Sequence, residues 1–488
     1  MGDRVRVCIV GAGFSGIAAA IELRRAGVND LVILERADRV GGAWRANTYP
    51  GCACDVQSRL YELNVAPWPQ WSRKFAGQQE IRGYLENAVQ IFGLEPHLRV
   101  NTEMRQARWD EGSLTWLVTT SAGDLECDVL ISACGGLTEP FTPLVPGSAQ
   151  FAGVQMHTAQ WDHSVDLTGK RVAVVGTGAS AIQVVPSIAP EVKELVVLQR
   201  TPPWILPRRD RAVPSWYQSL LAAVPPIQQA ARGLSSWARE VQLLSFTRQG
   251  AFRRMGERMA RRHLQAQVPA GPLREAVTPH YDMGCKRILL SDDYYPALTR
   301  SNVTVAPALD RITPTGIVDA AGAEHPVDVI VWATGFKVMD PPLADRVVGR
   351  TGLTLAETFA RSHMAAYRGT TVAGFPNLFI LQGPNTGLGH SSVVLMSEAQ
   401  IDYLVPAVAA DVVIEVRESA QTAYVDEIDR RLATTVWQEG GCRSWYQDGH
   451  GRNIALWPGS THGFARMMRR PDTDAYVVRR REDVHESA

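Results

Sequence analysis

Short apolar runs alternate with stretches of helix-forming residues along most of the chain. Residues 5–10 and Leu31–Leu34 form apolar runs, and residues 17–26 between them are helix formers. The same order returns later, with strands predicted at Arg171–Val175 and at residues 195–198. Apolar runs of this length, bounded by turn residues, are typical of buried strands in a parallel sheet. The pattern predicts an α/β fold with two Rossmann-like units.

A glycine-rich turn joins the first predicted strand to the first predicted helix. It carries Gly11, Gly13 and Gly16. This spacing allows a tight turn, close approach of the backbone to a pyrophosphate, and close packing of helix on strand. Amide groups at the helix N-terminus then point at the phosphates. The next strand ends at Glu35, where a carboxylate can accept hydrogen bonds from an adenosine ribose, so the first unit is predicted to bind a dinucleotide.

A second glycine-rich turn follows the strand Arg171–Val175. It carries Gly176, Gly178 and Ser180, with alanine in the place of the third glycine, which close helix packing tolerates. The following strand ends in Arg200 and Thr201 rather than in an acid. A guanidinium suits a ribose 2′-phosphate, whereas a carboxylate favours NAD. NADPH is therefore the predicted nucleotide, with an ordinary surface arginine as the alternative interpretation of Arg200.

Charge and hydropathy exclude several classes of protein. The 488 residues include 50 basic and 50 acidic side chains, so no net field attracts nucleic acid. No apolar run approaches the length of a membrane span, and none is predicted as a transmembrane segment. The first strand begins within a few residues of Met1, which leaves no room for a signal peptide. A cytoplasmic protein is expected.

The cysteines have no recognisable pattern. There are seven, scattered along the chain, and an odd, unpatterned set is not typical of a disulfide framework. We therefore expect reduced thiols. Cys52 and Cys54 lack the matching second pair that a zinc site needs, so no metal site is predicted.

Proline and glycine residues mark candidate domain boundaries. The prediction is a first dinucleotide-binding domain made of residues 1–145 and 338–488, with the second domain, residues 146–337, between these parts. Residues 215–267 have no strand pattern, many arginines and few acids, so a helical insertion is predicted there. Its basic, amphipathic character is more often a solvated helical face than a membrane-binding surface.

The stretch between the two glycine turns carries aromatic, glycine and histidine residues at a fixed spacing. The positions are Phe151, Gly153, His157, Trp161 and Asp162. Such a long string is far harder to meet by chance than one glycine turn. Because the string connects the two units, we interpret His157 as a hinge or positioning residue, with a satisfied structural histidine as the alternative.

A second string covers residues 41–55 and includes Gly42, Trp44, a Tyr-Pro-Gly sequence and a final Asp55. With both strings present, the chain resembles the type I Baeyer–Villiger monooxygenases, a group of flavin-dependent monooxygenases. The resemblance runs nearly end to end. It implies FAD in the first unit and NADPH in the second. It also implies that Trp44 packs on the flavin, whereas a tryptophan beside glycines is otherwise a core residue.

The resemblance implies a reaction in which reduced flavin takes up oxygen at its C4a carbon and the resulting peroxide attacks a ketone. An arginine stabilises the anions without protonating them. In the family this arginine lies in a stretch that resembles residues 284–287, so the role is carried to Arg287. Asp55 is implied to hold Arg287 in place, with Tyr61 hydrogen-bonded alongside, and Lys286 to reach the nucleotide's extra phosphate. A purely structural salt bridge is the alternative for the Arg-Asp pair.

Two C-terminal stretches also resemble family features. Asn385 lies in a Gly-Pro-Asn-Thr-Gly sequence before a predicted helix, and the resemblance places this region at the flavin ring, with His390 and Ser391 close by. Trp445 lies in a stretch that resembles a mobile loop over the nicotinamide. An aromatic anchor under a loop is the alternative for Trp445.

The predicted function is therefore NADPH-dependent insertion of one oxygen atom of O2 beside a ketone carbonyl, which gives an ester or lactone. One alternative is oxidation of nitrogen or sulfur, or hydroxylation, by the same flavin chemistry. The other is a nucleotide-binding redox protein, or an NADPH oxidase that releases peroxide and forms no oxygenated product.

Overall fold

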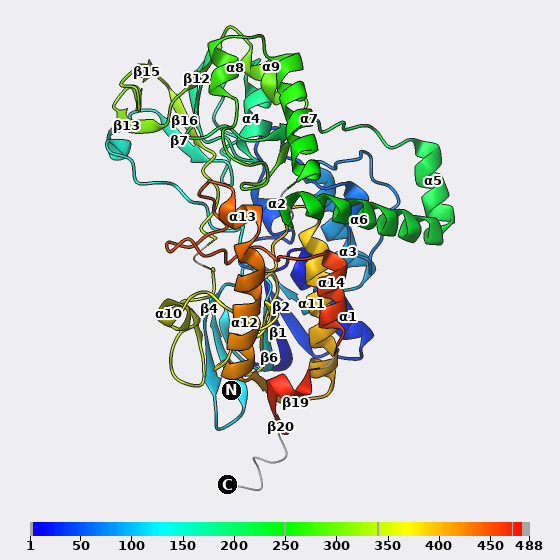
Figure 1. Cartoon of the computed structure of the whole chain (residues 1–488). Coiled ribbons are helices and arrows are strands. Elements are labelled where there is room, and N and C mark those ends of the chain that lie inside the picture. The colour runs from blue at the N-terminus through cyan, green and yellow to red at the C-terminus, as the bar shows by residue number, and fades with distance from the viewer. Residues whose placement is uncertain (1–2, 248–249, 339–340, 471, 481–488) are drawn as a thin grey trace.

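Two separate sheets organise the chain, and the computed structural model describes residues 3–247, 250–338, 341–470 and 472–480 (Figure 1). The first sheet has eight strands in the order β17-β4-β5-β6-β1-β2-β3, with β18 paired to β6. Its strands are β1 (Asp3–Val10), β2 (Leu31–Leu34), β3 (Leu98–Arg99), β4 (Met104–Asp110), β5 (Thr115–Thr120), β6 (Gly123–Ser132), β17 (Val347–Val348) and β18 (Leu378–Ile380).

Helices cover one face of this first sheet, and a second hydrophobic core lies along its other face. The apolar sides of α1 (Phe14–Arg25), α3 (Gln78–Ile91) and α11 (Val393–Ala409) share one core with β1 and β2. The strands β4, β5 and β6 of the same sheet pair antiparallel and bury Trp109 and Trp116 in the second core, which also includes residues of β1 and β2. The strands β17 and β18 come from the last third of the chain and pair in parallel with β4 and β6, so distant segments build one sheet.

The second sheet is fully parallel, with the order β12-β9-β8-β16-β7. Its strands are β7 (Val154–His157), β8 (Arg171–Val175), β9 (Glu194–Leu198), β12 (Val303–Ala306) and β16 (Val329–Trp332). Residues of α4 (Ala181–Ile188) and α9 (Tyr294–Leu298) bury one face. The predicted α/β class with two Rossmann-like units is confirmed.

Smaller elements complete the second unit and the C-terminal region. A three-stranded antiparallel sheet packs near the other face of the second sheet, and β10 pairs with β11. The remaining elements are α2 (Ala43–Ala46), β10 (Ile205–Leu206), α8 (Pro272–Ala276), β11 (Leu289–Leu290), β13 (Leu309–Thr313), β14 (Gly316–Asp319), β15 (Glu324–Pro326), α10 (Leu355–Arg361), β19 (Val412–Val416), α12 (Glu418–Ala433), α13 (Val436–Glu439), α14 (Thr461–Met468) and β20 (Tyr476–Arg480).

Three helices, α5 (Ser215–Ala223), α6 (Pro225–Thr247) and α7 (Ala251–Gln267), lie between the second unit's strands β10 and β11. Figure 1 shows α5 and α6 reaching sideways, away from the second sheet. The helix α6 rests on the first unit, where Arg232 pairs with Glu398 of α11 at 2.8 Å. Within the part of the chain that the structure covers, no helix combines the length and apolar character needed to cross a bilayer.

The expectation that all thiols are reduced is wrong for two of the seven cysteines. Cys285 and Cys442 form a disulfide with 6.1 Å between their Cα atoms. The two residues are 157 positions apart and lie in loops that only the tertiary fold brings together, so no sequence spacing signals the bond. Among the described residues the other cysteines are free: Cys8, Cys52, Cys54, Cys127 and Cys134.

Candidate functional site

Two glycines of the first turn, Gly11 and Gly16, have no room for a side chain. A Cβ on Gly16 would lie 1.9 Å from the carbonyl oxygen of Gly11, and one on Gly11 would lie 2.7 Å from that of Ala133. Gly13 begins α1, and Gly42 faces it so closely that a Cβ on Gly42 would lie 3.1 Å from the Gly13 Cα. Two bare backbones therefore meet at a helix N-terminus, which suits the phosphates of a dinucleotide.

The carboxylate of Glu35 is fixed beside this turn. One oxygen accepts a hydrogen bond from the Ala12 amide at 3.0 Å and the other from the Ala37 amide at 2.9 Å. Glu35 is buried, at the end of β2. An acceptor held this close to the glycine turn fits the ribose hydroxyls of a bound adenosine, as the sequence predicts.

Aromatic residues form a wall next to the turn. The Trp44 indole donates a hydrogen bond to the Tyr61 hydroxyl at 3.1 Å, and the Tyr61 ring lies edge-on to Phe14 with 4.9 Å between centroids. Burial raises the pKa of Tyr61, so its hydroxyl stays protonated. The Tyr61 hydroxyl accepts a hydrogen bond from Trp44, and the charges of Asp55 and Arg287 also act on it, so its predicted hydrogen bond alongside Asp55 stays a prediction.

Asp55 and Arg287 form a bidentate ion pair. Arg287 Nε lies 2.9 Å from one Asp55 oxygen and a terminal nitrogen lies 2.7 Å from the other. Burial alone would raise the pKa of Asp55, but the Arg287 charge and its hydrogen bonds lower it below the ordinary value. The carboxylate in turn raises the pKa of Arg287. Both groups are therefore held charged, and the pair joins the first unit to the second.

Asp55 reaches this position because its own segment is fastened to the second unit. The Tyr49 hydroxyl donates to the side-chain oxygen of Gln183 on α4 at 2.9 Å, and the Gln183 amide donates to the Ala53 carbonyl at 2.9 Å. Gly51 is required between them, because a Cβ there would lie 2.3 Å from the Ser187 hydroxyl. The Tyr-Pro-Gly sequence thus serves as an inter-unit contact.

A second guanidinium near the pair is missed by the sequence analysis. Arg239 of α6 is electrostatically coupled to both Asp55 and Arg287. Burial lowers the pKa of Arg239, Asp55 opposes this shift, and Arg287 adds to it. The only signal in the sequence is the general richness of residues 215–267 in arginine, which does not single out one position.

The second glycine turn is more open than the first. Gly176 has a φ of +116° and no room for a Cβ, which would lie 2.5 Å from the Ala333 carbonyl oxygen, whereas Gly178 has free space. Ser180 begins α4. The Thr201 carbonyl accepts a hydrogen bond from the Thr177 hydroxyl at 3.0 Å, which closes the end of β9 onto the turn.

Two cations converge beside this second turn. Arg200 is exposed just after β9, and Lys286 lies with its ammonium 5.2 Å from the centre of the Tyr281 ring. Burial lowers the pKa of Lys286, and the charge of Arg200 lowers it further. Two neighbouring positive charges at a helix-terminal turn form a site that an anionic phosphate would neutralise.

Relatives of known class match nearly the whole chain. A profile of the family described as pyridine nucleotide-disulphide oxidoreductase matches residues 8–224. A Baeyer-Villiger monooxygenase of Streptomyces coelicolor is 47% identical over 485 residues, covering 98% of this chain and 93% of that protein. One of Pseudomonas aeruginosa is 44% identical, covering 96% and 91%. This chain belongs to the Baeyer–Villiger monooxygenase family.

Solved structures agree with this assignment. A steroid monooxygenase in its oxidised form, bound to NADP, superposes with a TM-score of 0.84 at 29% identity, covering 98% of this chain and all of that one. A closed structure of cyclohexanone monooxygenase gives a TM-score of 0.87 at 25% identity, with the same coverage.

The string of residues 151–162, between the two units, sets the path of the backbone of this monooxygenase rather than forming part of the Asp55–Arg287 ion pair. A Cβ on Gly153 would lie 2.3 Å from the Asp328 carbonyl oxygen, so the glycine lets the chain pass close to β16. His157, at the end of β7, is buried and accepts a hydrogen bond from the Ala159 amide at 3.0 Å. Burial lowers the pKa of His157, so the neutral ring is favoured.

The other members of the string flank β7. Phe151 and Trp161 pack at the edges of the two cores of the second unit. Asp162 is exposed and accepts hydrogen bonds from the backbone and hydroxyl of Ser164 at 2.9 and 2.6 Å. These contacts fit the positioning role predicted for the string, because they set the path of the connection between the monooxygenase units.

One of the two C-terminal stretches is anchored through Asn385, and the other lies near Arg287. The buried Asn385 amide donates to the carbonyls of Asn453 and Leu456 at 3.0 and 3.2 Å, so its side chain ties two loops together. Trp445 is 47% exposed, whereas its neighbour Tyr446 is buried. Burial raises the pKa of Tyr446, and the nearby charge of Arg287 opposes this shift. The loop thus presents one aromatic ring to solvent and one to the ion pair.

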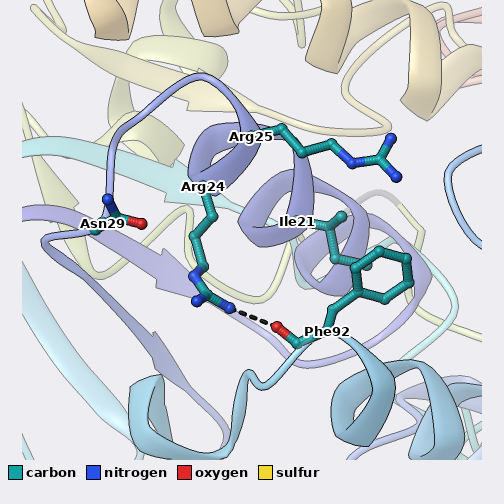
Figure 2. Close-up of a pocket in the computed structure, with 5 residues that line it drawn as sticks. All are labelled: Ile21, Arg24, Arg25, Asn29 and Phe92. Carbon is teal, nitrogen blue, oxygen red and sulfur yellow. Dashed lines mark hydrogen bonds between the residues drawn. The ribbon is translucent and has the colours of Figure 1, made fainter.

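Figure 2 shows a pocket of about 220 Å³ that belongs to neither nucleotide turn. It is lined by Ile21, Arg24, Arg25, Asn29 and Phe92, and the Arg24 guanidinium donates to the Phe92 carbonyl. It lies at the end of α1 opposite Gly13, about 18 Å along a 12-residue helix. Neither Asp55 nor Arg287 lines this hollow.

Proposed function

We propose that this protein holds FAD in the first unit and NADPH in the second, and oxygenates a ketone to an ester or lactone. The observation that carries the proposal is the bidentate Arg287–Asp55 pair, which stands where the two units meet. Membership of the family indicates the class of reaction. We propose that this reaction takes place beside the Arg287–Asp55 pair.

The residues around the first turn fit a bound flavin dinucleotide. The facing backbones of Gly13 and Gly42 leave the narrow space that a pyrophosphate needs, and Glu35 offers acceptors to a ribose. Bound FAD supplies the oxygen chemistry, because it takes a hydride from NADPH and then reacts with O2. Side chains of the protein supply what else the reaction needs, which is stabilisation of negative charge, binding of the nucleotide and exclusion of water.

Arg287 meets the main requirement, which is to stabilise negative charge without giving up a proton. A guanidinium does not act as an acid at neutral pH, and Asp55 raises the pKa of Arg287 still further. It can therefore stabilise an attacking oxygen anion and the oxyanion of the tetrahedral adduct of the ketone. Asp55 positions the guanidinium, and the nearby charge of Arg239 compensates for the carboxylate.

The nucleotide is held by cations of the second unit. Arg200 supplies a fork of donors for the 2′-phosphate, and Lys286 supplies a second positive charge from the loop that also carries Arg287. Lys286 and Arg287 are adjacent in the chain. Binding of a phosphate at Lys286 therefore directly affects the position of the Arg287 guanidinium.

The loop that carries Trp445 and Tyr446 closes the site. Tyr446 is buried against the ion pair, and burial raises its pKa to about 12, so it stays neutral there. A closed site excludes water and protects a reactive oxygen species from unproductive breakdown to hydrogen peroxide. Loop closure is thus part of the proposed function.

A panel of acceptors tests the proposal. The purified holoenzyme is incubated with NADPH, O2 and cyclic, linear or aryl ketones, beside thioethers, and products are identified by mass spectrometry. The expected result is an ester or lactone one oxygen atom heavier than the ketone, with a matching loss of NADPH. Sulfoxides with no ester from any ketone would favour heteroatom oxidation, and NADPH loss without any oxygenated product would favour an oxidase.

A further inference from the structure

The loop that closes the site is joined covalently to the loop that carries Arg287. Cys285 lies two residues before Arg287, and Cys442 lies three residues before Trp445. Their disulfide is a direct bridge between these two functional loops. None of the sequence strings that identify the family includes this pair.

The contacts around the bridge are few and local. The Asp282 amide donates to the Gly440 carbonyl at 3.2 Å, and a Cβ on Gly440 would lie 2.8 Å from the Cys285 Cβ. At the other end, buried Tyr446 anchors the loop. Residues 441, 443 and 445 between these anchors are exposed, and Cys442 between them packs against the neighbouring core and makes the covalent link to the Arg287 loop.

The two cysteines differ in exposure. Cys285 is 1% exposed, whereas Cys442 is partly exposed. A small thiolate can therefore approach the Cys442 side of the bridge, and the buried Cys285 sulfur is the leaving group. This asymmetry suits a bond that is opened from outside and closed again by its own buried partner.

We propose that Cys285 and Cys442 are a reversible redox modification site, at which small dithiols or hydroperoxides control whether the loop of residues 440–446 can leave the Arg287 site. In reduction, a dithiol forms a mixed disulfide with Cys442 and releases the Cys285 thiolate. The second thiol of the reductant then displaces Cys442 and leaves as a cyclic disulfide. In oxidation, the two thiols give two electrons to a hydroperoxide. An organic hydroperoxide is reduced to an alcohol and water, and hydrogen peroxide is reduced to two water molecules.

Control of this loop has a chemical consequence, which rests on the proposed function. With the bridge closed, the loop stays on the site and water is excluded. With the bridge open, the segment loses its covalent link to the Arg287 loop, so the nucleotide leaves faster and more NADPH is spent on hydrogen peroxide. Hydrogen peroxide then restores the bridge, so the side product of a leaking site closes it.

The bond itself is tested without any assay of oxygenation. The folded holoenzyme is treated with dithiothreitol, or with hydrogen peroxide after reduction, then alkylated in denaturant and digested. We expect a peptide that links Cys285 to Cys442 after peroxide and two additional alkylated thiols after reduction. Free thiols at both positions in the peroxide-treated protein would overturn the proposal.

Loop release is tested with trypsin, because Arg443 lies exposed within the segment. Cleavage after Arg443 is expected to be at least about tenfold faster in the reduced protein and in Cys442→Ser, because proteolysis follows local opening. Cys134→Ser is the matched control, since its sulfur donates to the Val10 carbonyl and a hydroxyl can do the same. Equal cleavage in the oxidised and reduced wild-type protein would overturn loop control, and this comparison needs no variant to fold.

The effect on turnover is read separately, as the ratio of ester formed to NADPH consumed. We expect the ratio to fall by at least about threefold on reduction and to recover after peroxide treatment and its removal. An unchanged ratio would contradict control of the reaction by the loop. If neither form makes an oxygenated product while the trypsin result holds, the proposed function fails and the redox site stands.

Discussion

The two glycine turns have the same strand-turn-helix topology, but the surroundings of the first turn are more enclosed than those of the second. At the first turn, Gly16 has no space for a side chain and Glu35 is buried and hydrogen-bonded to the turn. At the second, Ala181 stands in the place of Gly16, Gly178 has open space and Arg200 is exposed. The first is built for a group that stays, and the second for a nucleotide that enters and leaves.

The largest effect that separates the two turns is expected from adding one methyl group. Gly16→Ala places a Cβ 1.9 Å from the Gly11 carbonyl, so the turn must open and the first unit should lose FAD or fail to fold. In the second turn the position equivalent to Gly16 already carries Ala181, so the control there is Gly178→Ala, whose added Cβ has nothing within 4 Å to meet. Flavin absorbance of the purified proteins measures this, and a Gly16→Ala protein with full flavin content would contradict the contrast.

The charge at the second turn gives the next effect. Arg200→Ala is expected to raise the KM for NADPH by about 100-fold, because a charge-assisted contact with the 2′-phosphate is worth about 1.5–3 kcal/mol. The KM for NADH should change little. Steady-state kinetics with both nucleotides measure the difference, and equal rises in both KM values would remove Arg200 from phosphate recognition.

A smaller effect is expected where the helical insertion rests on the first unit. Glu62 is buried and accepts hydrogen bonds from Trp71 and from Gln228 of α6. Burial raises the pKa of Glu62 from 4.5 to about 7, although these hydrogen bonds oppose the shift. The folded protein then binds a proton that the unfolded chain releases, so the free energy of unfolding falls as pH rises from 4.5 to 7.

Glu62→Gln removes this titration, and the side chain of Gln228 can rotate its amide to match. The variant should therefore lack about 2 kcal/mol of the wild-type decline across that pH range. Urea unfolding at several pH values measures it. A variant with the same pH dependence as the wild type would show that Glu62 does not titrate there.

Local pattern was enough for the parts of the fold that are built from neighbours in sequence. The strand ending at Val10, the Gly11 turn and Glu35 are close together in the chain, and their spacing carries the geometry. The Asp55–Arg287 pair spans 232 positions, and no periodicity points to it. The family resemblance predicts this pair, and in the structure the two side chains are in contact.

Other features depend on contacts that leave no mark in local sequence. Arg239 is one of several arginines in the helical insertion of residues 215–267, and only the placement of α6 over the first unit brings it near Asp55. The same holds for Cys285 and Cys442, which an odd count of scattered cysteines made look unpaired. Side chains that meet across two units require the tertiary fold.

The most direct test of the central claim follows both half-reactions in Arg287→Ala, with Arg287→Lys as the variant that keeps the charge but loses the two-point contact with Asp55. Flavin reduction by NADPH is followed by absorbance, and ester formation by mass spectrometry. The account predicts flavin reduction close to the wild-type rate and ester formation lowered by at least about 1,000-fold in the alanine variant. Ester formed by Arg287→Ala at the wild-type rate would contradict it.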